Sequence, residues 1–221
     1  MSKQIIIGFT TEGGTDIQFL ESVIQRSFED VAFECKGQIE VLPVQYIKKQ
    51  SGSFAEMVKT CARQAEHQGI MVLCIHADAD DTTDTNTFNC KINPAFIAIN
   101  DTQGKNMCKN LVPIVPVQMT EAWMLSDKDL LKAEIGTNKN DEELGIDKSP
   151  EIYNNPKQTI ETAIRVARQN LPKRRRRELT ISELYSPIGQ KVALNTLENL
   201  PSYRRFKEAV RGAFKKLNYL Y

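Results

Sequence analysis

Several features are scarce in this chain of 221 residues, and each absence excludes a class of protein. No apolar stretch approaches the roughly 18 residues that a membrane-spanning helix needs, so we expect none. The five cysteines form no C-x-x-C pair, and neither histidine lies at zinc-ligand spacing from a cysteine, which argues against a structural zinc site. No G-x-x-x-x-G-K-[ST] loop occurs, so the chain should not hydrolyse ATP through a P-loop.

The cysteine content and the start of the chain indicate where the protein works. An odd number of scattered cysteines is typical of reduced thiols that serve mainly in packing. The apolar stretch Ile5–Ile7 is too short for the core of a signal peptide. We therefore expect a cytoplasmic protein that is not associated with a membrane.

The formal net charge of +1 identifies no partner, but the charges are unevenly distributed. Acidic residues concentrate in 78–84, and residues 173–177 form a run of five bases. Such regions can hold a divalent metal and a phosphate backbone, respectively. Charge alone favours a simpler explanation, in which both are solvated surface loops.

The first half of the chain alternates strand-like and helix-like patterns. We expect a helix that begins at Thr15 or Asp16, and a second that begins at Ser53 and ends at Gly69. Pro43 suggests an edge position or a bulge in its strand. The four expected strands are residues 5–10, 39–47, 70–75 and 112–117. This alternation predicts an α/β fold with a parallel sheet flanked by helices.

The second half has helical patterns only, and we place a soft boundary near residue 120. Residues 1–120 would form the α/β domain, and residues 121–221 a C-terminal helical extension that completes or covers the site. Residues 136–156 are rich in Gly, Asn, Asp and Pro and are expected to form a loop. The expected helices are 122–131, 157–169, 181–186, 192–199 and 202–216. The last of these can pack in the core or form an interface, which leaves a homo-oligomer open.

Two acidic motifs carry the strongest functional signal. Glu12-Gly13-Gly14-Thr15-Asp16 and Asp78-Ala79-Asp80-Asp81 each follow directly after an expected strand. The carboxyl ends of parallel strands meet at one edge of a sheet, so these carboxylates can share a metal ion. Hard oxygen ligands favour Mg²⁺ or Mn²⁺ over zinc. Each motif alone is equally well explained as an ordinary turn or polar loop; their occurrence together favours a shared site.

The order of these motifs resembles the TOPRIM domain of topoisomerases, primases and the overcoming-lysogenization-defect nucleases. The similarity is closest to a small stand-alone TOPRIM family that is often encoded beside an ATPase and is implicated in bacterial defence against phage. The shared features also include Glu121-Ala122-Trp123 followed by Asp127, Asn155-Pro156-Lys157, and the stretch 183–217. One departure concerns residue 119, which is acidic in that family and is methionine here.

The resemblance implies a metal-dependent nuclease that cleaves DNA or RNA, uses Mg²⁺ or Mn²⁺, and acts with an ATPase partner in antiviral defence. Glu12 would be a metal ligand or general acid/base. Asp78 and Asp80 would be metal ligands, and Asp81 a possible further one. Asp16 and Glu121 would be auxiliary residues of the site.

Candidate substrate-binding residues come from three places. Gly13 and Gly14 would let a phosphate approach the backbone at the start of the next helix. Lys157 can meet a phosphate, although an exposed lysine at a helix start is common. The run Lys173 to Arg177, including Arg174, Arg175 and Arg176, suits a nucleic-acid backbone. A solvated or partner-docking loop explains that run equally well.

Two residues near the motifs have simpler explanations. Trp123 can line the site, but a core anchor is the more common role of such a residue. His76 can tune the site, although such a histidine is more often packed or hydrogen-bonded locally.

Two other functions remain open. Met119 and the modest net charge motivate a non-catalytic TOPRIM-like subunit that binds nucleic acid or a partner protein. The same carboxylates can also serve nucleotidyl or phosphate-monoester chemistry on a small substrate, in which case the basic run would be irrelevant.

Overall fold

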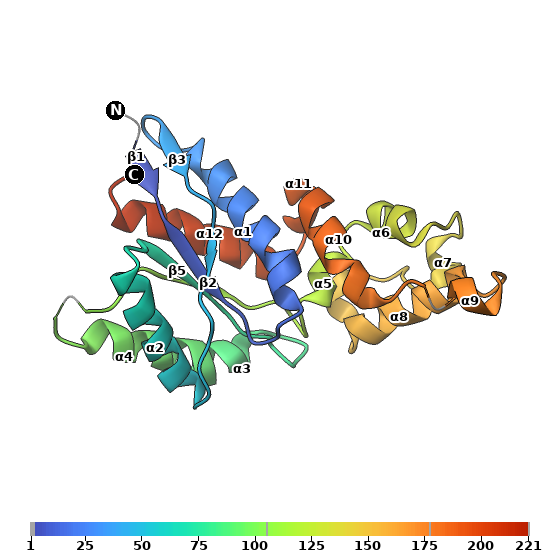
Figure 1. Cartoon of the computed structure of the whole chain (residues 1–221), viewed down its shortest axis with the longest axis horizontal. Helices are drawn as coiled ribbons and strands as arrows, with labels where there is room; N and C mark the ends of the chain where they lie inside the picture. The colour runs from blue at the N-terminus through green and yellow to red at the C-terminus, as the bar shows by residue number, and fades with distance from the viewer. Residues whose placement is uncertain (1–2, 105, 177, 221) are drawn as a thin grey trace.

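A parallel β-sheet forms the centre of the molecule (Figure 1). The computed structural model describes residues 3–104, 106–176 and 178–220. Four strands pair in the order β4-β2-β5-β6, and β1 pairs with β3 beside them, all in parallel. The strands are β1 (Lys3–Ile5), β2 (Ile7–Thr10), β3 (Ile39–Val41), β4 (Gln45–Tyr46), β5 (Val72–His76) and β6 (Leu111–Ile114). The predicted α/β class with a parallel sheet flanked by helices is confirmed.

Two of the four predicted strands are interrupted. The first divides at Ile6 into β1 and β2, and the second divides around Pro43 into β3 and β4. Proline cannot donate a ladder hydrogen bond, so it is tolerated where the strand lies at the edge. Both β3 and β4 are edge strands, as Pro43 suggested.

Helices cover both faces of the sheet because every residue of β5 is buried and its side chains alternate between the faces. On one face α1 (Asp16–Ala32) and α12 (Pro201–Lys216) pack against residues such as Phe9 and Cys74. On the other face α2 (Phe54–His67) and α4 (Asn93–Asp101) pack against Leu73 and Ile75. The three layers are visible in Figure 1.

The predicted start of α2 is confirmed. The Ser53 side chain accepts a hydrogen bond from the Glu56 amide, and Glu56 reaches back to Ser53 in a capping box. The chain leaves the helix at Gly69, whose φ of 70° favours glycine.

The segment 90–110, which had no clear pattern, contains a long helix with an irregular centre. The helix starts with α3 (Thr85–Thr87), passes through a π-helical turn at Phe88–Ile92, and continues as α4. In that turn the Asn93 amide donates to the Phe88 carbonyl, five residues back. Pro94 follows directly and lacks an amide hydrogen, so a regular helical ladder cannot run through this point.

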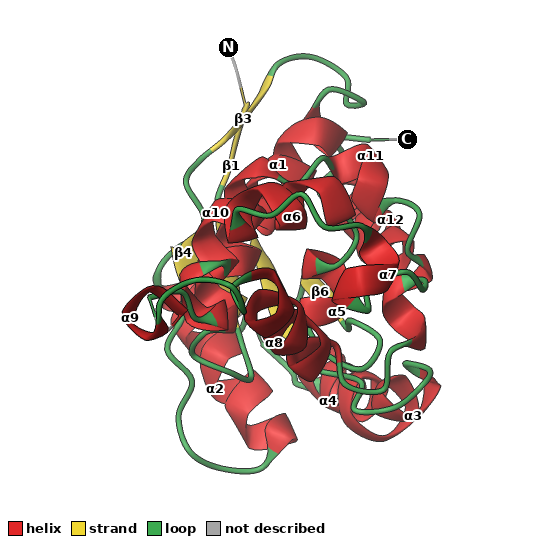
Figure 2. Cartoon of the chain, turned by 90° about the vertical axis from the view of Figure 1, so that its right-hand side faces the viewer, coloured by secondary structure: helices red, strands yellow, loops and turns green. Residues whose placement is uncertain are grey.

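Most helices of the second half extend away from the sheet, whereas α12 packs on it (Figure 1). The extended part faces the viewer in Figure 2. The predicted helix 122–131 is two helices in the structure. The second begins at Lys128, and the Asp127 side chain caps it by accepting a hydrogen bond from the Leu130 amide. The expected loop 136–156 contains a short helix and a 3₁₀ turn at Pro150–Ile152. The helices are α5 (Glu121–Met124), α6 (Lys128–Ile135), α7 (Asp141–Leu144), α8 (Pro156–Ala167), α9 (Lys173–Arg176), α10 (Tyr185–Lys191) and α11 (Leu194–Leu197), with a 3₁₀ turn at Ile181–Glu183.

The C-terminal part of the chain returns to the α/β half. Helix α10 packs along α1, where Gly189 approaches the Phe19 backbone so closely that an added Cβ would lie 2.7 Å from the Phe19 carbonyl oxygen. Helix α12 packs against β6 and α1 and buries Phe206, Val210 and Phe214 in the core. The hydrophobic core therefore includes residues from both sides of residue 120, and the domain boundary there stays a prediction.

Trp123 is a core anchor, which was the simpler of its two explanations. It is fully buried, its ring packs edge-on against Tyr203 at 5.3 Å, and its Nε1–H donates to Ser202 Oγ at 2.7 Å. Within the described residues, no helix combines the length and the apolar character that crossing a membrane requires.

An ion pair joins the acidic segment 78–84 to α12. Asp84 is 1% exposed, and its Oδ1 accepts a hydrogen bond from the guanidinium of Arg205, whose side chain is 54% exposed. Among the described residues, the other oxygen of Asp84 is buried without a hydrogen-bond partner. Asp84 is thus a structural residue of this segment, and the solvent-exposed Arg205 compensates its buried charge.

We predict that Arg205→Met destabilises the protein by about 2–3 kcal/mol, because it leaves a buried carboxylate without its counter-ion. Arg204→Met is the matched control, because Arg204 is exposed and its guanidinium donates only to the Glu198 carbonyl in the described structure. It should cost about 0.5 kcal/mol or less. Urea unfolding followed by circular dichroism measures both; equal losses would show that the pair does not contribute.

Candidate metal centre

Glu12, Asp78 and Asp80 lie at the edge of the sheet where β2 and β5 end. Glu12 Oε2 accepts a hydrogen bond from the Asp78 amide at 3.3 Å. Glu12 Oε1 and Asp80 Oδ2 lie 4.0 and 3.9 Å from the same atom, Lys91 Nζ. These contacts place Glu12 beside the Asp78 backbone and near Asp80, but the group of side chains that meets a 4.8 Å limit among the described residues is a different one. That the three carboxylates share an ion stays a prediction.

The backbone after β5 presents Asp80 to solvent. Asp80 has a φ of 51°, a left-handed conformation that aspartate adopts more readily than most residues. Its amide donates to the Gln118 carbonyl at 2.9 Å, and the Gln118 amide donates to the Asp81 carbonyl at 3.1 Å. These bonds fix the loop against the chain that follows β6. Desolvation and the Asp78 carboxylate raise the pKa of Asp80, and the Lys91 ammonium opposes this shift.

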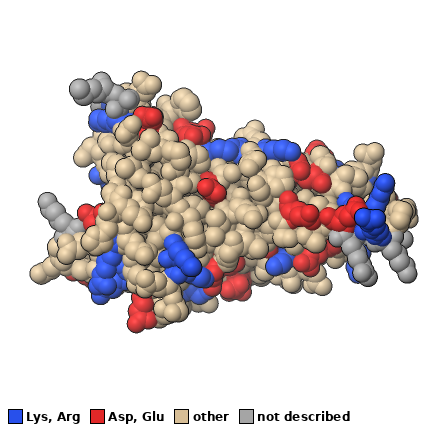
Figure 3. All heavy atoms as spheres, viewed as in Figure 1, with Lys and Arg blue, Asp and Glu red and all other residues tan. Residues whose placement is uncertain are grey.

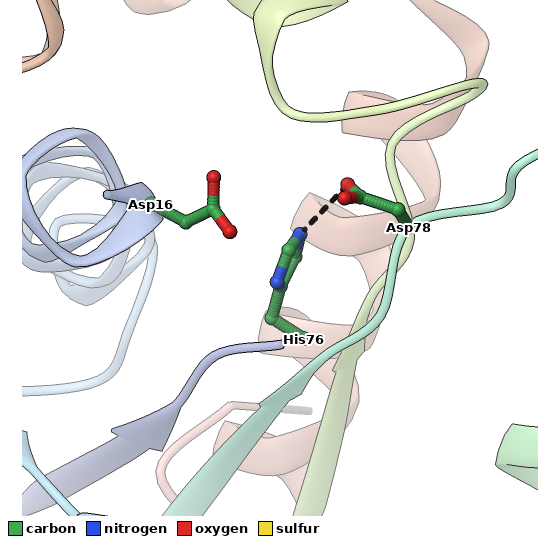
Figure 4. Close-up of side chains that lie close together, drawn as sticks. All are labelled: Asp16, His76 and Asp78. Carbon is green, nitrogen blue, oxygen red and sulfur yellow. Dashed lines mark ion pairs between the residues drawn. The ribbon is translucent and has the colours of Figure 1, made fainter. Parts of the chain in front are cut away.

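A second, more buried group lies behind these carboxylates. Asp16, His76 and Asp78 each place a potential metal-ligand atom within 4.8 Å of the others (Figure 4). Among the described residues, the acidic, histidine and cysteine side chains that meet this 4.8 Å limit are these three. Glu12 and Asp80 do not belong to the group. Asp78 therefore belongs to both the open and the buried group.

His76 connects the two acidic motifs. The ring is fully buried, and its Nδ1 accepts a hydrogen bond from the Glu12 amide at 3.3 Å. A neutral ring that accepts at Nδ1 carries its proton on Nε2. Nε2 lies 3.3 Å from Asp78 Oδ1 and 3.1 Å from Thr120 Oγ1. His76 thus fixes both the Glu12 backbone and the Asp78 carboxylate.

The buried group has perturbed acidities. Burial opposes a charge on His76, but the neighbouring carboxylates of Asp78, Asp16 and Glu12 outweigh it and raise the pKa of the ring. Burial also raises the pKa of Asp16. The pKa of Glu121 is raised by burial as well, although the Tyr185 hydroxyl donates a hydrogen bond to its carboxylate.

The sequence left Thr15 or Asp16 as the start of α1, and the structure has Thr15 at the N-cap, where no side-chain capping hydrogen bond forms within the described residues. The Asp16 carboxylate turns back and accepts a hydrogen bond from the Gly13 amide at 3.0 Å. It lies beside His76 and faces the site.

The other predicted site residues are more dispersed. Asp81 is exposed, and its Oδ1 accepts from the Thr82 amide at 2.7 Å. Glu121 is buried beside the Asp16 group, whereas Lys157 is exposed in the first turn of α8. Arg174 and Arg175 are exposed on α9, at the end of the helical half that lies farthest from the sheet (Figures 1 and 3). Arg177 and the side chains of Lys173 and Arg176 lie outside the described part of the chain.

Sequence reasoning missed four contributors to this centre. Lys49 donates a hydrogen bond to the Glu12 carbonyl, and Lys91 lies between Glu12 and Asp80. Thr120 donates its amide to Asp78 Oδ1 at 3.0 Å, and Tyr185 bonds Glu121. Tyr185 lies in the stretch 183–217 that contributes to the resemblance, but nothing in it pointed to Glu121. Lys91 lies in a segment without a motif, where Pro94 is a local signal of an irregular helix.

Comparisons with protein-family models, with curated proteins and with solved structures found no match to this chain.

We predict that Gly13→Ala disrupts the buried group, because the added Cβ would lie 2.5 Å from Asp16 Oδ2. Moving this carboxylate breaks its hydrogen bond with the residue 13 amide, and we expect a loss of about 1–2 kcal/mol in unfolding free energy. Gly14→Ala is the control, since its Cβ meets no atom within 4 Å. Thermal unfolding of both variants measures the difference, and a Gly14→Ala loss as large as that of Gly13→Ala would contradict the assignment.

Proposed function

We propose that this chain is a TOPRIM-like nuclease that uses Mg²⁺ or Mn²⁺ to cleave phosphodiester bonds in DNA or RNA. The observation that carries the proposal is the position of Glu12, Asp78 and Asp80 in the segments that follow two adjacent parallel strands. Carboxylates at such an edge are typical of sites that hold hard divalent cations.

The residue types present suit such an ion, although the ligand atoms that lie within 4.8 Å of one another are those of Asp16, His76 and Asp78. The Lys91 ammonium already occupies a position within 4.0 Å of both the Glu12 and the Asp80 carboxylates, so a cation is electrostatically favoured there. All three carboxylates are at least partly exposed, at 45%, 23% and 66% of their side chains for Glu12, Asp78 and Asp80. They supply oxygen atoms only, which suits Mg²⁺ or Mn²⁺.

A bound ion would polarise the phosphodiester and lower the pKa of water. Glu12, Asp78 and Asp80 would hold it, and Asp81 is a candidate further ligand. His76 serves the reaction indirectly, because its two nitrogens hold the Glu12 backbone and the Asp78 carboxylate in place. Asp16 extends this support, since it bonds Gly13 in the turn that presents Glu12.

The partners rest on weaker support. The resemblance to the stand-alone TOPRIM family supports an ATPase partner and a role in antiviral defence in the cytoplasm. Arg174 and Arg175 on α9 support contact with a nucleic-acid backbone, because both side chains are exposed. A homo-oligomer stays a hypothesis, since the apolar face of α12 is buried within the chain.

We predict that Glu12→Gln, Asp78→Asn and Asp80→Asn each reduce Mn²⁺-dependent cleavage by about 100-fold or more, because each removes a charged metal ligand. Asp101→Asn, which changes an exposed carboxylate on α4, should cleave like the wild type. The assay uses plasmid, single-stranded DNA and RNA with Mg²⁺ or Mn²⁺, with folding checked by circular dichroism. Unchanged cleavage in the three variants would refute the site, and a wild type that binds but never cuts would favour the non-catalytic subunit.

A second candidate function is phosphate chemistry on a small substrate. It is favoured by the position of α9, which lies at the far end of the helical half and not beside the carboxylates (Figure 1). A small substrate would need no contact with that helix, whereas a polymer can reach both regions.

Neutralising Arg174 and Arg175 to glutamine separates the two functions. If the substrate is a polymer that contacts α9, the slope of log affinity against log salt should fall by about one to two units, because up to two phosphate contacts are lost. Fluorescence anisotropy of a labelled oligonucleotide over a salt series measures the slope. An unchanged slope and unchanged cleavage would remove α9 from the substrate path and favour the small substrate.

A further inference from the structure

The position of Lys91 is the feature that the proposed reaction leaves unexplained. Its ammonium lies 4.0 Å from Glu12 Oε1 and 3.9 Å from Asp80 Oδ2, between two of the three proposed metal ligands. The Lys91 side chain is 36% exposed, so the stem is partly packed while the charged end faces the carboxylates. A positive group therefore lies where the proposed metal would be attracted.

The local backbone explains how Lys91 reaches this position. Lys91 lies in the π-helical turn Phe88–Ile92, which inserts a wider turn between α3 and α4. Single π-helical turns are rare and frequently occur at functional sites. A wider turn changes the direction of the side chains in it relative to a regular α-helix. Here the turn carries the only base of the segment Phe88–Ile92, and that base faces the site.

The electrostatic role of Lys91 follows from the charges around it. Glu12, Asp78 and Asp80 carry like charges in neighbouring segments, so they would repel one another without a nearby cation. The Lys91 ammonium relieves the repulsion by contacting two of the three. A divalent ion offers twice the charge to the same oxygens, so the ammonium and the ion compete for them.

We propose that Lys91 is the resident counter-ion of the carboxylate site and that a divalent cation displaces it on binding. In this role Lys91 is a positioning residue: it keeps Glu12 and Asp80 facing each other in the metal-free protein, and it sets the concentration at which the metal enters. This inference rests on the metal site of the proposed function, but not on what that site cleaves.

The test compares Mn²⁺ binding to the full-length wild type, Lys91→Met and Lys216→Met by isothermal titration calorimetry, without nucleic acid. Lys91→Met removes the competitor, and we expect Mn²⁺ to bind on the order of tenfold more tightly. Lys216→Met is the matched control, since it removes the same charge from an exposed position in the last turn of α12. Its gain should be about twofold or less, because a screened charge away from the ligand oxygens matters little.

A conservative variant and a stability measurement separate competition from a structural effect. Lys91→Arg keeps the charge and should bind Mn²⁺ about as the wild type does. In EDTA, Lys91→Met should melt at a lower temperature than the wild type. Adding Mn²⁺ should raise the melting temperature of Lys91→Met by more than it raises that of the wild type.

Three results would overturn the inference: unchanged or weaker Mn²⁺ binding in Lys91→Met, an equal gain in Lys216→Met, or no Mn²⁺ binding by any of the four proteins. The last would also remove the proposed metal site. If instead the expected binding order is found and no protein cuts any nucleic acid, the role of Lys91 stands and the nuclease proposal fails.

Discussion

The parallel pairing of β2 with β5 is the constraint on which the candidate site depends. Thr10 pairs with Ile75 in this register, so the chain segments that follow leave the sheet side by side. Glu12 and Asp78 then come close enough for the Asp78 amide to reach the Glu12 carboxylate. A slip of one residue would turn the alternating side chains of β5 to the opposite faces, and the tight packing on both faces opposes such a slip.

Concentrating carboxylates at one edge costs electrostatic free energy, and the structure offsets it in two layers. On the exposed side the Lys91 ammonium contacts Glu12 and Asp80. On the buried side His76 and the Thr120 amide hold Asp78, and the Gly13 amide holds Asp16. The buried layer fixes the positions of Asp78 and Asp16, whereas the exposed layer is open to solvent. If the proposed metal ion binds, the buried layer would orient its ligands.

Sequence patterns predicted the parts that local chemistry determines. The strand at 70–75 reads as apolar on both faces and is β5, and Ser53 starts α2 through its capping box. The acidic motifs were found because they directly follow strands. Long-range contacts gave no such signal: Lys91 depends on a π-helical turn, Tyr185 reaches Glu121 across 64 residues, and Asp84 pairs with Arg205 across 121 residues. The sequence could not decide between Thr15 and Asp16 at the start of α1, because the proximity of Asp16 to His76 depends on a contact across 60 residues.

The claim that Glu12, Asp78 and Asp80 share one divalent ion is tested most directly by anomalous diffraction from crystals grown with Mn²⁺. The account predicts an anomalous peak about 2.0–2.3 Å from an oxygen of each of these three carboxylates, the usual range for hard divalent ions. No ordered peak there, or a peak held by Asp16 and His76 with Glu12 and Asp80 facing away, would contradict it.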